Sequence, residues 1–335
     1  MKSTISIQGK LLKTMRWMGL AAFGAVVPMA SGVAAETFPT KPVTLIVPYS
    51  PGGGTDVLAR IIAKGLEGNL GQSVIVDNRP GAGGTIGAAI AAQAPADGYT
   101  VLILNAIPHT SSAGLYSKLS YDPVKSFTAI GSIAETPYVL VAGPSIKAKT
   151  FKEFIEYARA NPGKVNYASS GIGGVSHLTT ELFKSMSKLQ MRHVPYKGDG
   201  PSITDLLGGY VDINFGNMLA MMPHIKTHKM KAFAVTSAER SKILPDVPTV
   251  AESGYPDFVV VGRFGLAAPA GTPPDIISRL SDALAKTVKS TAIVDQLNKQ
   301  GVNPKPSTAK EFNDIMNTES AKWLGVIRDV GIKAQ

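Results

Sequence analysis

The sequence has 335 residues, 44% of them hydrophobic, with no cysteine and a formal net charge of +10. Without cysteine the chain has no disulfide bonds and no thiol for lipid attachment. The basic surplus raises the possibility of nucleic acid binding, but no run of five or six Lys or Arg occurs, and no basic stripe with interleaved aromatic residues. Attraction of small anions is therefore the better interpretation of the charge.

The first 35 residues have the pattern of a secretory signal peptide. Four basic residues precede an uncharged stretch, residues 17–35, which ends in Val33-Ala34-Ala35 before Glu36. A membrane anchor is the alternative, since about 18 apolar residues can span a bilayer, but Pro28 and Gly32 disfavour it. We expect cleavage after Ala35, export to the periplasm and a freely soluble mature chain. Its net charge is near +6, because 30 of the 34 basic residues remain against 24 acidic ones.

Short apolar runs alternate with segments of helical periodicity along the mature chain, which predicts an α/β fold with mixed, mostly parallel sheets. We expect strands at 43–47, 74–76, 101–104, 139–142, 165–168, 192–194 and 211–215. We expect helices at 55–66, 86–92, 151–160, 177–186, 202–207, 273–288, 292–300 and 309–330. The 300 residues of the mature chain suit two domains of roughly 150 residues each.

A glycine-rich turn follows the first predicted strand. Pro48-Tyr49-Ser50-Pro51 leads into Gly52-Gly53-Gly54-Thr55-Asp56, where the first helix begins. Glycines allow the backbone to approach a ligand closely, and unpaired N–H groups at a helix start attract an anion. The dinucleotide G-x-G-x-x-G pattern is not completed and no phosphate-binding G-x-x-x-x-G-K-[ST] occurs, so no nucleotide cofactor is predicted. The structural alternative is a tight turn capped by Thr55 or Asp56.

A second loop of the same kind follows the strand at 165–168. It runs from Ser169-Ser170-Gly171 through two further glycines to Ser176 and His177. Two such loops on two lobes could face one another at the carboxyl ends of the strands, where open α/β sheets bind ligands. A third glycine turn, residues 81–87, is interpreted as close packing of a helix on the first sheet.

Catalytic and metal-binding patterns are weak. Ser176 and His177 are adjacent, but no G-x-S-x-G elbow is present, and adjacent residues on a helix point in different directions. An exported hydrolase is therefore only the alternative interpretation. His224 and His228 have the i, i+4 spacing of a metal pair, yet no third ligand is near, so we predict no metal site.

Longer motifs resemble the Bug family, the extracytoplasmic receptors of tripartite tricarboxylate transporters. These motifs cover nearly the whole mature chain in order: 48–56 with Ala59-Arg60, 167–171 through His177-Leu178, 193–198, 205–209 with Val211-Asp212, 244–249 with 251–254, and 269–273. The resemblance implies a two-lobed type II periplasmic-binding fold of the Venus flytrap kind, in which the chain crosses between the lobes twice. Residues 36–138 and 238–335 would form lobe one, and residues 139–237 would form lobe two.

The resemblance also implies a ligand carboxylate held mainly by backbone groups and water between the first glycine loop and lobe two. Carried over to this chain, it nominates Tyr49, Gly53, Gly54, Thr55 and Asp56 on one side and Ser169, Ser170, Gly171, Tyr196 and Lys197 on the other. The protein would be a monomeric receptor, without catalysis or a cofactor. It would deliver a small organic acid to membrane transporter subunits.

Three residues depart from the family pattern: Gly174, Asp199 and Arg263. Gly174 stands where a hydroxyl residue is common, Asp199 replaces a small neutral residue, and Arg263 replaces an aromatic one. Asp199 has two interpretations. It could face the ligand and act on selectivity, or it could be an exposed turn residue or helix cap before Pro201.

Overall fold

The computed structural model describes residues 38–333, so the predicted leader lies outside the described residues. The described residues belong to one compact unit. Within the described part of the chain, no helix combines the length and apolar character that crossing a bilayer needs.

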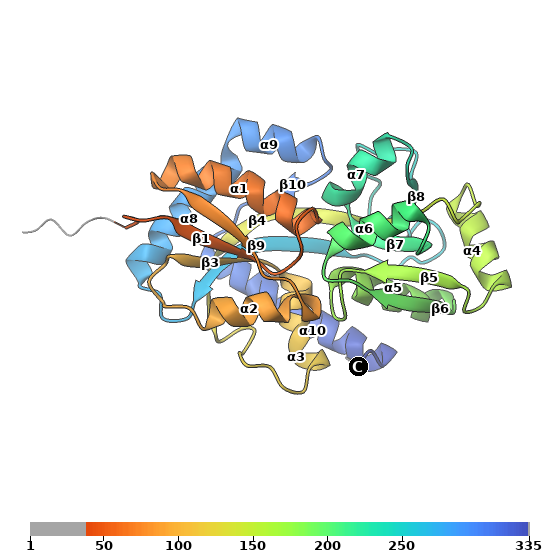
Figure 1. Cartoon of the computed structure of the whole chain (residues 1–335), viewed down its shortest axis with the longest axis horizontal. Helices are drawn as coiled ribbons and strands as arrows, with labels where there is room; N and C mark the ends of the chain where they lie inside the picture. The colour runs from red at the N-terminus through yellow and green to blue at the C-terminus, as the bar shows by residue number, and fades with distance from the viewer. Residues whose placement is uncertain (1–37, 334–335) are drawn as a thin grey trace, which may run out of the picture. The chain divides into compact units, whose positions relative to one another are not determined.

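The elements alternate between strand and helix along most of the chain (Figure 1). The first group is β1 (Val43–Val47), α1 (Gly54–Leu70), β2 (Val74–Asn78), η1 (Ala82–Gly84), α2 (Thr85–Ala92), β3 (Thr100–Asn105) and α3 (Ala106–Leu115). The second is β4 (Phe127–Ala142), α4 (Phe151–Ala160), β5 (Val165–Ser169), α5 (Val175–Ser187), β6 (Met191–Pro195), α6 (Asp199–Gly208), β7 (Ile213–Asn217), α7 (Met218–Lys226) and β8 (Lys231–Val235). The third is β9 (Val261–Pro269), α8 (Pro274–Lys289), α9 (Thr291–Asn298), β10 (Asn303–Pro304) and α10 (Ala309–Val330).

The strands follow the order β2-β1-β3-β9-β4-β7-β5-β6, with β8 and β10 also paired to β4. The outer strands pair in parallel, β1 with β2 and β3, and β5 with β6 and β7. Every antiparallel pair involves β4 or β9, so the sheet is mixed, with a larger antiparallel share than the sequence predicts.

Strand β4 belongs to both halves of the molecule. Phe127 to Pro137 pair with β9, and from Tyr138 onward the same strand pairs with β7 and β8. Two register shifts interrupt its first part, between Ala129 and Gly131 and between Ser132 and Ala134. Such bulges break the two-residue alternation that identifies a strand in a sequence, which explains why only residues 139–142 were predicted. β4 and β9 run side by side through the middle of the molecule (Figure 1).

Helix α1 illustrates how local chemistry places an element. It begins after the glycine turn and ends at Gly71, whose left-handed backbone (φ 74°) lets its N–H bond to the Glu67 carbonyl. Leu58, Ile62 and Leu66 lie four residues apart on one face, and all are buried. This face packs against the first half of the sheet and α8, which fixes the start of α1 at the centre of the molecule.

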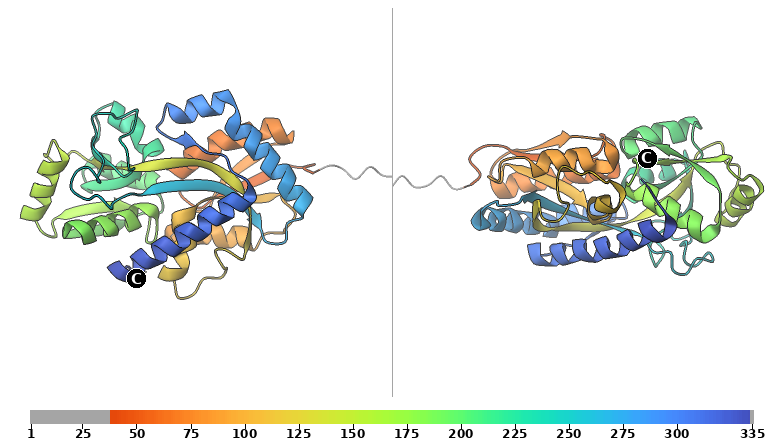
Figure 2. Two further views of the ribbon diagram at one scale, coloured as in Figure 1. Left: turned by 180° about the vertical axis from the view of Figure 1, so that it is seen from behind. Right: turned by 90° about the horizontal axis from the view of Figure 1, so that it is seen from below.

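Each half has its own apolar core, and α10 contributes to both. Phe312 and Met316, near its beginning, pack in a cluster with residues of β3 and β4. Trp323 and Ile327, further along, pack with Phe154 and other residues of the second half. In the left view of Figure 2, α10 (dark blue) runs in front of the sheet from one half toward the other. The crossing strands and α10 together connect the two halves.

Candidate functional site

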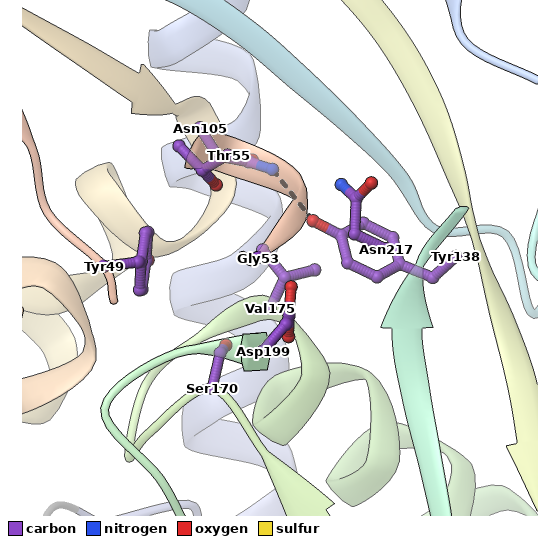
Figure 3. Close-up of a pocket in the computed structure, with 9 residues that line it drawn as sticks. All are labelled: Tyr49, Gly53, Thr55, Asn105, Tyr138, Ser170, Val175, Asp199 and Asn217. Carbon is purple, nitrogen blue, oxygen red and sulfur yellow. Dashed lines mark hydrogen bonds between the residues drawn. The ribbon is translucent and has the colours of Figure 1, made fainter. Parts of the chain in front are cut away.

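A small cavity lies where strands from both halves end. It is lined by residues of the β1–α1 loop and the start of α1, the β5–α5 loop, the ends of β3 and β7, strand β4, and the starts of α5 and α6: Tyr49, Gly53, Thr55, Asn105, Tyr138, Ser170, Val175, Asp199 and Asn217 (Figure 3). These strand ends are the carboxyl ends of β1, β3 and β7, the position at which α/β sheets bind ligands. Its volume of about 20 Å³ is room for little more than a water molecule.

The two halves touch around this cavity. The Lys197 carbonyl accepts hydrogen bonds from the Ser50 backbone N–H at 3.0 Å and the Ser50 hydroxyl at 2.9 Å. The Tyr116 hydroxyl donates to the Ile172 carbonyl at 2.9 Å. An organic acid of several carbons therefore needs the halves to separate or side chains to move before it can enter.

The β1–α1 loop is braced from behind by Asp56. The Asp56 carboxylate accepts hydrogen bonds from the Gly52 N–H (3.0 Å), from Asn78 (2.9 Å) and from Arg60 (3.1 Å). Burial opposes ionisation of Asp56, but the hydrogen bonds from Arg60, Gly52 and Asn78 outweigh it, and the pKa is lowered. Asp56 does not line the cavity, and its direct contact with a ligand stays a prediction. Asp56 holds the turn that carries Gly53 and Thr55, which line the cavity.

Tyr49 forms one wall of the cavity. Its hydroxyl donates to the Gly83 carbonyl at 3.0 Å, and its side chain is buried. Burial, with the nearby Asp199 carboxyl, raises the pKa of this phenol far above its ordinary value, so Tyr49 stays neutral. A second small cavity also borders Tyr49 and is lined by Leu102, Leu104 and other residues of the first half.

Two asparagines and Tyr138 complete the cavity, and none of the three was predicted. Asn105 and Asn217 are each the last residue of a strand and the cap of the next helix, accepting from the N–H groups of Ile107 (3.1 Å) and Leu219 (2.9 Å). The Asn105 amide also donates to the Tyr138 hydroxyl at 3.1 Å (Figure 3). An asparagine directly after an apolar run is a recognisable helix-cap pattern. The helices that these two asparagines cap, α3 and α7, were nevertheless not predicted.

The loop after β5 contributes Ser170. Its backbone N–H donates to the Ser176 hydroxyl at 2.7 Å, which shapes the turn before α5. Gly171 has φ 118°, and a side chain there would meet the Tyr196 carbonyl at 2.9 Å and the Gly83 backbone at 3.2 Å. Gly171 is thus a contact between the halves and does not line the cavity. Ser169 is fully buried beside it and also does not line the cavity.

Tyr196 and Lys197 lie near the cavity without lining it. The Tyr196 hydroxyl donates to Asp205 at 2.5 Å, so it points along α6. Lys197 is exposed and contributes its backbone carbonyl to the contact with Ser50. Gly54 likewise does not line the cavity, but it packs directly against Asn217.

Asp199 lines the cavity as the first residue of α6, after the cap residue Gly198. Burial raises the pKa of this carboxyl to about 6, and a hydrogen bond from the Gly54 N–H opposes the rise. Asp199 is half-buried and lines the cavity at the start of α6, so it is not a fully exposed turn residue, and its contact with a ligand stays a prediction. Figure 3 shows it below the Gly53 turn, beside Ser170 and Val175.

The hydrolase interpretation finds no support in the hydrogen bonding. Ser176 bonds to Ser170, and the His177 Nδ1 atom accepts from the Gly173 N–H at 3.2 Å, so the two do not pair. A serine–histidine pair does exist, Ser169 Oγ to His193 Nε2 at 2.6 Å, but Ser169 is fully buried. Such a serine offers no accessible nucleophile. Among the described residues, no group of three or more potential ligands is placed to hold a metal ion, and this includes His224 and His228.

The other two departures from the family pattern also have structural explanations. A side chain at Gly174, the cap of α5, would meet the Ser170 hydroxyl at 2.5 Å. Arg263 lies on β9 and forms ion pairs with Glu135 on β4, at 3.2 Å, and with Glu319 on α10. Arg263 therefore ties the crossing strands to α10 and takes no part in lining the cavity.

Comparison with known proteins agrees with this architecture. The family described as the tripartite tricarboxylate transporter family receptor matches residues 58–332. BugT of Bordetella pertussis is 38% identical over 315 residues, which covers 94% of this chain and 97% of BugT.

Two solved structures from Rhodopseudomonas palustris also match. A protein solved with adipate is 36% identical, with a TM-score of 0.86, covering 89% of this chain and all of that one. MatC with bound malate is 32% identical, with a TM-score of 0.83, covering 87% of this chain and all of MatC. Structural neighbours include periplasmic binding proteins, and the predicted two-lobed type II periplasmic-binding fold is confirmed.

Proposed function

The chain belongs to the tripartite tricarboxylate transporter receptor family, of which the Bug proteins are members, and we propose that it captures a small organic acid between its two lobes. In this proposal the ligand carboxylate lies in the cavity at the start of α1. The chain binds and releases its ligand without chemical change.

The observation that carries the proposal is the composition of the cavity. Both halves contribute to it, and it lies at the carboxyl ends of strands, where the first turn of α1 presents the backbone of Gly53 and Thr55. Backbone N–H groups at a helix start favour an anion. Charge-assisted hydrogen bonds contribute roughly 1.5 to 3 kcal/mol each, so a few of them reach the roughly 8 kcal/mol of a micromolar complex.

The ligand class is supported by the relatives. Adipate and malate, present in two of the matching structures, are both dicarboxylates. We propose a small carboxylate-bearing molecule for this chain on the same grounds.

The proposed ligand-binding residues take different roles. Tyr49, Gly53, Thr55, Ser170 and Asp199 would contact the ligand directly, since they line the cavity. Gly54 and Gly171 would allow the halves to approach. Asp56, Ser169, Tyr196 and Lys197 would hold the loops in place through the hydrogen bonds described above.

We further propose that residues 36–138 and 238–335 form lobe one and residues 139–237 form lobe two. The change of partner along β4 at Tyr138 supports the first boundary. Ligand binding would then favour the closed arrangement, because a ligand shifts a conformational equilibrium by its difference in affinity for the two states. The receptor would act as a periplasmic monomer after removal of residues 1–35, and the closed form would dock on membrane transporter subunits.

A thermal-shift screen tests the proposal. The mature chain is mixed with mono-, di- and tricarboxylates, acidic amino acids and aromatic acids, with the dimethyl esters of the same diacids as uncharged controls. A ligand at about 100 times its Kd should add roughly 2.7 kcal/mol to the free energy of unfolding, and the esters should add nothing. Stabilisation by sugars or nucleotides but by no acid would refute the proposal. Hydrolysis of the esters would instead support the alternative function of a hydrolase.

A further inference from the structure

The cavity contains one formal charge, and it is negative. Of the nine residues that line it, eight are neutral and the ninth is Asp199. Among the described residues, no lysine, arginine or histidine forms an ion pair with Asp199. A carboxyl without a cationic partner is an unusual neighbour for an anionic ligand, because two like charges in a poorly solvated site repel each other.

Asp199 also lies close to the place proposed for the ligand carboxylate. A Cβ atom built on Gly53 would be 3.4 Å from the Asp199 Cβ and 3.4 Å from the Asp199 backbone nitrogen, and the nearby Gly54 N–H acts to lower the pKa of the Asp199 carboxyl. The helix start that would hold a ligand anion is thus shared with the receptor's own carboxyl. An acid that carries only negative charge must either displace the Asp199 side chain or bind while Asp199 takes up a proton.

A ligand with a positively charged nitrogen avoids this conflict, because the nitrogen can pair with Asp199 while its carboxylate takes the backbone of α1. We propose that Asp199 makes the site select acids that carry a cationic nitrogen beside the carboxylate over acids of negative charge alone. This inference rests on the proposed function and adds the residue that sets the selectivity. Tyr49 and Tyr138 line the same cavity as Asp199, and they strengthen the proposal because aromatic rings attract cations.

Matched ligand pairs test the proposal by calorimetric titration. Succinate is compared with aspartate, and adipate with 2-aminoadipate, so that each pair differs by one amino group. The Asp199→Asn variant keeps the shape and removes the charge. We expect the amino acid of a pair to lose about tenfold in affinity relative to its plain diacid. Asp257→Asn, which removes an exposed acidic residue remote in sequence from the cavity residues, is the charge-matched control and should leave the ratio unchanged.

A second measurement uses the unchanged protein and does not depend on the variant folding. Binding of a plain diacid should be accompanied by proton uptake, so its affinity should fall as the pH rises from 6 to 8. Binding of the amino acid favours ionised Asp199, so its affinity should rise through pH 6 and then level off. The titratable groups facing Asp199 are the hydroxyls of Tyr49 and Tyr138, whose pKa values burial raises, so they remain neutral throughout.

The outcomes separate this inference from the proposed function. If plain and amino acids bind but their ratio is the same in both proteins and at every pH, Asp199 does not set selectivity and the inference fails while the proposed function stands. If no acid of either kind binds the unchanged protein, the proposed function fails and the inference fails with it.

Discussion

Replacing Gly54 with alanine should prevent full closure of the lobes. A Cβ atom at residue 54 would be 2.7 Å from the Asn217 Cβ and closer still to its amide group. Asn217 cannot swing away easily, because it is buried and its side chain caps α7 by accepting from the Leu219 N–H. Gly54 starts α1 and Asn217 ends β7 in the other half, so the added methyl group separates the two halves.

The size of the effect follows from the cost of overpacking. One extra methyl group in a well-packed contact costs about 1 to 3 kcal/mol. The clash is absent from the open form, so the closed form alone is destabilised by this amount. Ligand affinity should therefore drop about 5- to 150-fold. The fold itself should survive, because alanine is a better helix residue than glycine and the clash disappears when the lobes part.

Gly68→Ala on the same helix is the matched control. Gly68 is exposed, and a Cβ there meets nothing within 4 Å. This variant should gain about 0.5 to 1 kcal/mol of stability from helix propensity and keep its affinity. Both variants are titrated calorimetrically with the acid found in the screen, and small-angle scattering compares their radii of gyration with ligand present. A Gly54→Ala protein that binds as tightly and becomes as compact as the control would refute the reasoning.

Two further predictions concern pH and processing. Burial lowers the pKa of His109 to about 4. The ring therefore stays neutral in the folded chain, while the same side chain in the unfolded chain takes up a proton near pH 6.5. As the pH falls from 6.5 to 4, on the order of 3 kcal/mol should be lost from the free energy of unfolding. Urea unfolding should show a smaller loss in His109→Gln, and equal losses would contradict the assignment. Mass spectrometry of the exported protein should find Glu36 as the first residue, whereas membrane-bound protein with Met1 intact would make residues 1–35 an anchor.

The sequence predicts best those elements whose ends carry their own signals. Helices α4 and α10 begin and end at the predicted residues, and both have a threonine cap. Thr150 accepts from the Glu153 N–H, and Thr308 with Glu311 forms a reciprocal capping box. These interactions are local, so they are visible in a short stretch of sequence.

Elements defined by distant partners are predicted poorly. β9 was not predicted, and two of its glycines explain why: Gly262 makes room for Tyr138 and Gly265 for Phe312. Glycine inside a strand weakens the local strand pattern. The side chains that require these two glycines are more than 40 residues away in the sequence. Helix α3 has the same difficulty, since its ten residues include a proline, a threonine and two serines and show no single apolar face.

The residues that line the cavity fall into the same two groups, those with a local sequence pattern and those without one. Tyr49, Gly53, Thr55 and Ser170 belong to glycine loops that stand out in the sequence, and the structure brings them together. Asn105 and Asn217 end their strands and Tyr138 lies within β4, and these three strands come together only after the sheet has formed. A residue of this second kind cannot be recognised from its neighbours in the chain, because its own segment specifies only a helix cap or a strand.

Arg263 and Asp199 show why an unexpected charge has to be judged by its partners. Both depart from the family pattern as charged residues where uncharged ones are expected. Arg263 has two carboxylate partners, Glu135 and Glu319, so its charge is compensated within the fold and serves to connect β4, β9 and α10. Within residues 38–333 Asp199 forms no ion pair, and it lines the cavity. A ligand with a positive charge can pair with a carboxyl that has no cationic partner in the protein. For that reason we propose a role in selectivity for Asp199 and a structural role for Arg263.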